Sequence, residues 1–265
     1  MKKEICIAVM VVLTAVFAVS TYFIVSHHIQ GKAQAELYDS LAEQVEATVL
    51  ESASATEPEA TEPTMLPELA DLYEQNKDLV GWICIEDTNI NYPVVQSVDR
   101  QDFYLKHAFD GSYSDYGCPY VQEDCDIYYS DNLVIYGHHM GNGSMFNNLE
   151  KFKSKDFWQE HKTVSFNTLM EKADYEIVAV FKTVAYTDSP DAFKYYRFVN
   201  AENADDFNTY IDRCKELSMY DTGVSAEYGD KLITLSTCEY SQANSRLVVV
   251  AKKIVDRPAL EAENS

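Results

Sequence analysis

The chain has 265 residues, of which 46% are hydrophobic, enough for one domain with a substantial core and additional segments. It carries 43 acidic and 21 basic residues, for a formal net charge of -22 at pH 7. This balance argues against a nucleic-acid partner, because a phosphate-binding surface needs clustered Lys and Arg side chains.

The N-terminal segment predicts a membrane anchor. An uncharged apolar run extends from Ile5 to Val25, close to the roughly 20 residues that a helix needs to cross a bilayer. Lys2 and Lys3 precede the run, which favours an N-terminus inside the cell and the bulk of the chain outside. A cleaved signal peptide is the alternative, but no persuasive small-x-small site follows the run. Residues 1–28 are therefore interpreted as a signal anchor of a single-pass protein with an extracellular catalytic domain.

Residues 29–65 are predicted to form an extracellular helix followed by a linker. Apolar residues at spacings of four form one stripe of an amphipathic helix: Leu37, Leu41, Val45 and Val49. The stretch ESASATEPEATEPTMLPE is rich in Glu, Ala, Thr, Ser and Pro. Because it can bury little apolar surface, it is expected to be a flexible stalk.

Residues 66–256 are predicted to be the catalytic domain, and most of its segments have strand patterns. GWICIEDTNINYPVVQ predicts a hairpin, and single strands are expected in NLVIYGHHM, TVSFNT, YEIVAVFKTVAYT, KLITLSTC and RLVVVAKKIV. MFNNLEKF and SKDFWQEH predict short helices, and AENADDFNTYIDRCKELSMY predicts a longer one capped by Asn203 or Asp205. This pattern favours a mainly β fold, either a mostly antiparallel barrel or a sandwich. Residues 257–265 are expected to be a frayed acidic tail.

The cysteines include one candidate nucleophile. No CxxC pair occurs, which disfavours zinc and thioredoxin-like sites, and the spacing of Cys118 and Cys125 leaves a disulfide between them open. Alternation along KLITLSTC places Cys238 at a strand end, on the same side as Thr234 and Ser236. Cys238 is therefore either a buried core thiol, as free cysteine often is, or a nucleophile.

A cysteine nucleophile needs a proton-transfer partner, usually histidine. The stretch VIYGHHMGNGSMF predicts a strand that delivers His138 and His139 to a Gly-rich turn. Arg246 opens the last predicted strand, eight residues after Cys238, and a hairpin would bring both side chains to one rim. A guanidinium there donates hydrogen bonds to a developing oxyanion. Ordinary loop histidines and a surface arginine are the alternative interpretation.

The order of these motifs resembles that of the class B sortases, cysteine transpeptidases that attach proteins to the cell wall of Gram-positive bacteria. The resemblance rests on GWICIEDTNINYPVVQ, DFYLKHAFDGSYSDYGCPYV, NLVIYGHHM and TLSTC followed by Arg246, and it covers roughly residues 69–254. It implies an eight-stranded sortase-type β-barrel with N-terminal helices and a helix between the sixth and seventh strands.

The resemblance also implies roles for individual residues. Cys238 is expected to be the nucleophile, His138 the general acid/base, and Arg246 the oxyanion or substrate clamp. His138 is preferred to His139 because the family histidine directly follows the glycine. The expected substrate-binding residues are Ser236, Glu239 and Leu105.

The implied reaction cleaves a C-terminal sorting motif, NPxTN-like or PxTG-like, after Thr through a thioacyl-enzyme. The protein is then transferred to a peptidoglycan amine, on a precursor or a cross-bridge, and no metal or other cofactor is required. The expected partners are surface proteins with sorting motifs, that amine and the membrane. The alternatives are a cysteine peptidase with water as acceptor, a pilin-polymerising sortase, and a non-enzymatic surface module with Cys238 in its core.

Overall fold

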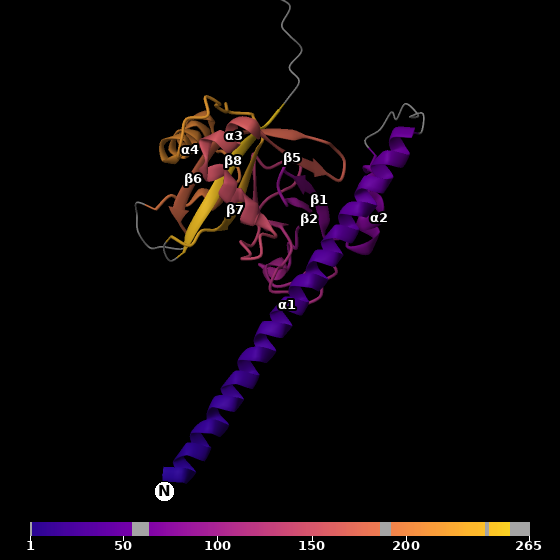
Figure 1. Cartoon of the computed structure of the whole chain (residues 1–265). Coiled ribbons are helices and arrows are strands. Elements are labelled where there is room, and N and C mark those ends of the chain that lie inside the picture. Colours follow the sequence, from indigo (N-terminus) through magenta and orange to yellow (C-terminus); the bar gives the residue numbers. More distant parts are fainter. Residues whose placement is uncertain (1, 55–63, 186–191, 242–243, 255–265) are drawn as a thin grey trace, which may run out of the picture. The chain divides into compact units, whose positions relative to one another are not determined.

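The structure is a computed structural model that describes residues 2–54, 64–185, 192–241 and 244–254 (Figure 1). The chain divides into two compact units, Met1–Ser40 and Leu41–Ser265. The predicted acidic tail, residues 257–265, and most of the predicted linker lie outside the described residues.

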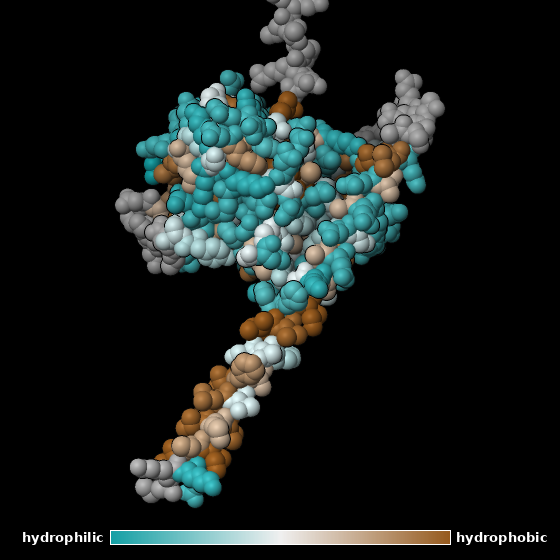
Figure 2. Space-filling model, viewed as in Figure 1, coloured by the Kyte–Doolittle hydropathy of each residue, from teal (hydrophilic) through white to brown (hydrophobic). Residues whose placement is uncertain are grey.

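The first unit lies within one long helix, α1 (Lys2–Ser54), which continues into the second unit. The predicted anchor and the predicted amphipathic helix are therefore one uninterrupted helix. No proline separates Val25 from Leu37, and the single glycine there, Gly31, is tolerated inside a helix. Apolar side chains cover the N-terminal part of α1 (Figure 2). By length and composition, its Lys3–Glu51 segment qualifies as a candidate membrane span.

Eight strands of the described residues close into a barrel in the order β1-β2-β3-β4-β7-β8-β6-β5 (Figure 1). The pairs β2–β3 and β4–β7 are parallel and the other pairs are antiparallel, so the barrel is mixed. The strands are β1 (Leu79–Cys84), β2 (Asn91–Val95), β3 (Tyr120–Val121), β4 (Asn132–Tyr136), β5 (Thr163–Thr168), β6 (Asp174–Val184), β7 (Leu232–Cys238) and β8 (Ser245–Lys253). The predicted eight-stranded barrel is confirmed.

Six further helical segments occur in the described residues, α2 before the first strand and the others in connections between strands. They are α2 (Pro67–Gln75), η1 (Phe103–Leu105), η2 (Phe146–Lys153), α3 (Lys155–Glu160), η3 (Tyr195–Arg197) and α4 (Ala204–Leu217), where η marks a 3-10 helix. The helix predicted between the sixth and seventh strands is α4, which packs against β6 (Figure 1). Of its two candidate caps, Asn203 is the one used, because its side chain accepts hydrogen bonds from the backbone N–H groups of Asp205 and Asp206.

Burial along β7 changes at its last residue. The strand is rich in aliphatic and β-branched residues, and every residue from Leu232 to Thr237 is buried. Cys238 is half-buried, because the strand there reaches the end of the barrel. The two other cysteines discussed above, Cys118 and Cys125, are free buried thiols, so the possible disulfide is not formed in this structure.

Candidate active site

Strand register brings the three predicted catalytic residues to one end of the barrel. β4 runs parallel to β7 with Tyr136 opposite Ser236, so the chain leaves both strands at the same end. His138 and Cys238 follow that pair by two residues each. In the antiparallel β7–β8 pair, Cys238 lies directly opposite Arg246. Directly opposed residues project from the same face with their Cβ atoms about 5 Å apart.

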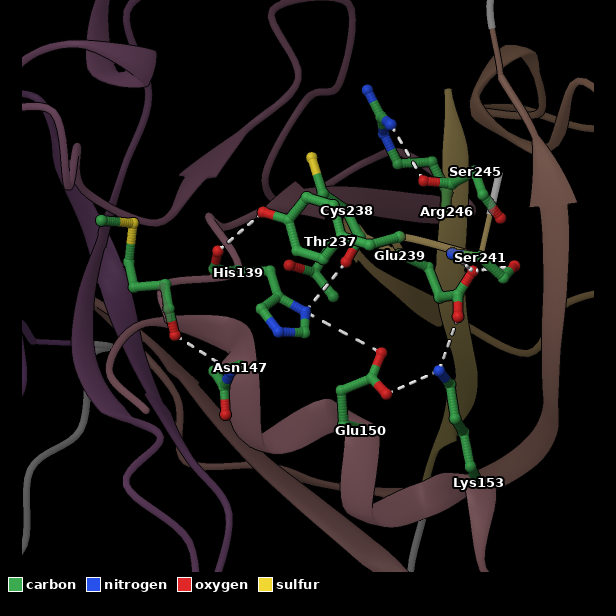
Figure 3. A network of polar contacts seen from close by, with 12 residues as sticks. His139, Asn147, Glu150, Lys153, Thr237, Cys238, Glu239, Ser241, Ser245 and Arg246 are labelled. Carbon is green, nitrogen blue, oxygen red and sulfur yellow. Dashed lines mark hydrogen bonds and ion pairs between the residues drawn. The ribbon is translucent and has the colours of Figure 1, made fainter. Parts of the chain in front are cut away.

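The surroundings of Cys238 combine an open thiol with a fixed main chain. Figure 3 shows the thiol and the Arg246 guanidinium extending to the same side of the two strands. The carbonyl oxygen of Cys238 accepts a hydrogen bond from Nδ1 of His139 at 3.0 Å. Arg246 donates from Nη1 to the Ser245 carbonyl at 3.0 Å. The nucleophile candidate is thus accessible while its backbone is held.

The His138 ring is oriented by a backbone carbonyl. Its Nε2 lies 2.7 Å from the carbonyl oxygen of Leu105. A carbonyl only accepts, so Nε2 carries the hydrogen in this contact and Nδ1 is the basic nitrogen of the neutral ring. Burial lowers the pKa of His138, the Leu105 hydrogen bond opposes that shift, and the cation of Lys106 adds to it. A neutral imidazole is the form that accepts a proton from a thiol.

Gly117 packs against this arrangement. It has a φ of +62°, and a Cβ added there would lie 2.5 Å from the Tyr104 carbonyl oxygen. The same Cβ would lie 3.1 Å from the Leu105 carbonyl oxygen and 3.2 Å from Cδ2 of His138. Glycine is required here both by the left-handed backbone and by the close approach of the Tyr104 carbonyl, and the His138 ring is a further tight neighbour.

Gly137, the glycine of the YGHH motif, is required by packing. A Cβ at this position would lie 2.4 to 2.8 Å from ring atoms of Phe146. Phe146 is fully buried and begins η2, so the turn that carries His138 lies tightly on that helix. Thr237 adds a further tie, since its hydroxyl donates to the Gly137 carbonyl at 2.8 Å.

The predicted substrate-binding residues occupy different environments. Leu105 is 38% exposed, and its carbonyl is the one that orients His138. Ser236 is buried, with its hydroxyl 2.6 Å from the Tyr195 hydroxyl. Glu239 is also buried and forms an ion pair with Lys153. Their roles in substrate binding stay predictions.

The described residues contain no group of three or more His, Cys, Asp or Glu side chains arranged to hold a metal ion. An accessible thiol, a neutral imidazole and a guanidinium at one rim suit nucleophilic attack on a carbonyl, with proton transfer and oxyanion stabilisation.

Comparison with known proteins decides the family. Residues 83–254 match the family model described as the Sortase domain. The Sortase B of Listeria monocytogenes is 34% identical over 83% of this chain and 88% of its own length. The chain belongs to the class B sortases. It is a sortase-type cysteine transpeptidase.

Other relatives of this sortase agree in sequence and in structure. The Sortase B of Staphylococcus aureus is 28% identical over 95% of this chain and 98% of its own. The solved Staphylococcus aureus sortase B-substrate complex matches with a TM-score of 0.74 at 28% identity, covering 86% of this chain and 100% of that one. Clostridium perfringens Sortase B matches with a TM-score of 0.63 at 33% identity, covering 70% of this chain and 98% of that one. The fold of this chain therefore matches that of solved sortase B structures.

Sequence reasoning missed several residues around the candidate catalytic residues of this sortase. Gly117 lies in the quoted motif SDYGCPYV, but nothing in the motif shows that it contacts His138. Glu150 lies in MFNNLEKF and Lys153 directly follows that stretch, so their i, i+3 spacing is visible in the sequence, yet the spacing does not show what the helix faces. The sequence identifies Tyr240 only as a loop residue, although its ring contacts His139.

Proposed function

We propose that this sortase is anchored in the membrane by α1 and transfers sorting-motif proteins to a cell-wall peptidoglycan amine. Cys238 is the nucleophile, His138 the general acid/base and Arg246 the oxyanion clamp. Ser236, Glu239 and Leu105 are the candidates that line the substrate groove. The peptide is NPxTN-like or PxTG-like and is cleaved after its Thr.

The proposed reaction has two half-reactions. The Cys238 thiol gives its proton to His138, and the thiolate adds to the Thr carbonyl carbon, with Arg246 donating to the oxyanion. The tetrahedral adduct collapses as the C–N bond breaks and His138 protonates the departing amine, which leaves a thioacyl-enzyme. An acceptor amine then adds to the thioester, gives a proton to His138 and displaces the Cys238 sulfur, which takes that proton from His138. The products are a new amide and the free thiol.

One observation carries this proposal, the register that opposes Cys238 and Arg246 while parallel β4 and β7 deliver His138 to the same end. The oriented imidazole supports it, because the Leu105 hydrogen bond leaves Nδ1 basic. The solved sortase B-substrate complex of Staphylococcus aureus shows that a relative of the same fold binds a substrate. The apolar part of α1 supports the anchor, with Lys2 and Lys3 favouring an extracellular catalytic domain.

The test uses the full chain in detergent with a small library of quenched sorting peptides and an added amine. We expect cleavage after Thr and an amide product when the amine is present. Cys238→Ala, His138→Ala and Arg246→Ala should each remove cleavage, and thiol labelling of the folded protein should occur at Cys238. Full activity of Cys238→Ala would refute the assignment and leave a surface module with a core thiol.

Product analysis separates the proposed transfer from its rivals. Mass spectra that show only a free Thr carboxylate, with or without amine, would identify a cysteine peptidase with water as acceptor. A product joined to the side-chain amine of a pilin lysine, in preference to peptidoglycan amines, would identify a pilin-polymerising sortase. Preference for the peptidoglycan amine supports wall anchoring.

A further inference from the structure

One edge of the 3-10 helix η2 is polar and faces the loops that follow β4 and β7. Side chains at i and i+3 eclipse one another in a 3-10 helix, so Asn147, Glu150 and Lys153 lie along one edge. Figure 3 shows this edge facing His139 and the segment after Cys238. These side chains contact the two loops that carry the catalytic residues.

Lys153 links η2 to the residue that follows the nucleophile. Its Nζ lies 2.8 Å from Oε1 of Glu239 and 2.6 Å from Oε2 of Glu150. Glu239 is only 6% exposed, and a buried carboxylate is tolerated only with a partner charge and hydrogen bonds. Those hydrogen bonds come from the backbone N–H of Ser241, at 3.0 Å, and from the Ser241 hydroxyl. The main chain just after Cys238 is therefore held to η2.

His139 forms the second link. Its Nδ1 donates to the Cys238 carbonyl and lies 3.8 Å from Oε1 of Glu150, an electrostatic contact rather than a hydrogen bond. Tyr240 returns a hydrogen bond from its hydroxyl to the His139 carbonyl at 3.0 Å, and its ring meets the imidazole edge-on at 4.9 Å. Asn147 donates from Nδ2 to the Met140 carbonyl at 2.9 Å. The turn that carries His138 is thus tied to both η2 and the Cys238 segment.

We propose that Lys153 is the centre of a positioning network, with Glu150, His139 and Glu239, that fixes the backbone of Cys238 relative to His138. The network rests on the proposed function, since it acts through those two catalytic residues. It touches the reacting atoms only through main chain and neighbouring loops. The sequence predicts that Glu239 lines the substrate groove. In this proposal, Glu239 acts by holding the main chain after Cys238 to η2.

The electrostatics of Glu239 agree with an ion pair to Lys153 that stays charged. Burial alone would raise the pKa of Glu239, but hydrogen bonds from Lys153 and Ser241 lower it to about 2. The carboxylate therefore stays ionised down to strongly acid pH. Loss of Lys153 would remove its nearest partner, since Lys182 lies farther away at 3.9 Å.

The test compares Lys153→Met with Lys153→Arg in the full chain in detergent. Two rates are measured, transpeptidation with its kcat and KM, and alkylation of Cys238 by iodoacetamide, followed by mass spectrometry of the peptide that contains it. We expect Lys153→Met to lower kcat about 10- to 100-fold with KM changed less than about threefold, because small misplacements of reacting groups have effects of this size. Alkylation should slow as well, and Lys153→Arg should restore most of both rates.

Lys231→Met is the matched control. Lys231 forms an ion pair with Asp131 at 3.0 Å and also donates to the Tyr129 carbonyl, but it precedes β7 at the end opposite to Cys238. Lys231→Met removes the same charge and the same kind of contact as Lys153→Met. We expect Lys231→Met to change thermal stability about as much as Lys153→Met while leaving kcat and alkylation at the parental values.

A second pair of variants keeps the test decisive if Lys153→Met does not fold. The amide nitrogen of Asn overlays Nδ1 of His, so His139→Asn should keep the bond to the Cys238 carbonyl and retain kcat. His139→Leu should lose kcat as Lys153→Met does. Equal kcat values for the two His139 variants would overturn the proposal.

Two other outcomes also overturn it. Parental kcat and alkylation in Lys153→Met would show that the network does not position Cys238. A raised KM with unchanged kcat would show that Glu239 acts on the peptide directly. The proposed function fails separately, if parental protein turns over no sorting peptide while alkylation still depends on Lys153.

Discussion

At the scale of single residues, the His138 ring has two neighbours that limit where it lies. The Leu105 carbonyl fixes Nε2, and Gly117 leaves room for Cδ2. Both come from the segment between β2 and β3, far from His138 in sequence. The position of the proposed general acid/base therefore depends on the segment between β2 and β3.

Gly117→Ala should damage both stability and turnover. The φ of +62° disfavours any Cβ, at about 1 kcal/mol or more, and the contact with the Tyr104 carbonyl forces the backbone to shift. That shift moves the Leu105 carbonyl away from His138, so we expect kcat to fall more than tenfold. Urea unfolding and peptide turnover, both on the full chain in detergent, measure the two effects.

Gly111→Ala is the control for backbone strain alone. Gly111 has a φ of +77°, but a Cβ there would meet nothing within 4 Å. We expect a similar strain cost and no change in kcat. If both alanine variants lose turnover equally, contact with the His138 environment is not the reason that Gly117 is needed.

The strand-end positions of the three residues proposed for catalysis were predictable because each lies beside a recognisable motif. Alternation along β7 put Cys238 at the end of its strand, and the Gly-His pair marked the end of β4. The network around Lys153 was not predictable, because its contacts join segments separated by as many as 99 residues, as His139 and Cys238 are. Local spacing reveals which side chains share an edge and does not reveal what that edge meets.

At the scale of elements, seven of the eight strands lie in stretches whose pattern predicted a strand. The exception is β3, whose two residues are too few to show alternation. The local sequence pattern also could not predict the parallel pairing of β4 with β7, since this pairing depends on how the barrel closes. That pairing is what places His138 near Cys238.

The start of α4 offers a test of local prediction. The Asn203 side chain accepts from Asp205 N at 2.9 Å and from Asp206 N at 3.1 Å. Asn203→Ala should lower the free energy of unfolding by about 1 kcal/mol, because two helix N–H groups lose their acceptor. Asn203→Asp should retain it. Urea denaturation followed by circular dichroism gives the comparison.

The other candidate cap provides the control for this element. Asp205 lies in the first turn of α4, where its charge interacts with the helix dipole. Asp205→Ala should therefore cost only about 0.3–1 kcal/mol. A larger loss in Asp205→Ala than in Asn203→Ala would contradict the assignment of the cap.

At the scale of the whole molecule, the chain joins a strongly acidic barrel domain to an apolar helix. The net charge of -22 for the whole chain favours solubility. The uninterrupted α1 was not predicted, because the sequence was divided where its hydropathy changes. Hydropathy marks where a helix meets a different solvent, whereas caps and breakers such as proline mark where a helix ends.

The proposed anchor has a direct test. Leu13 and Val16 are exposed apolar residues near the centre of the Ile5–Val25 run. An arginine at the centre of a bilayer helix costs about 2.5–3.5 kcal/mol on insertion scales. The double variant Leu13→Arg/Val16→Arg should therefore leave the carbonate-resistant membrane fraction of expressing cells. The matched control, Ala47→Arg/Leu50→Arg, places the same charges at the same spacing beyond the run, at exposed positions, and should remain in that fraction.

Protease added outside intact spheroplasts should digest the barrel domain of the parent. Retention of Leu13→Arg/Val16→Arg in the membrane, or full protection from the protease, would contradict the anchor or its orientation.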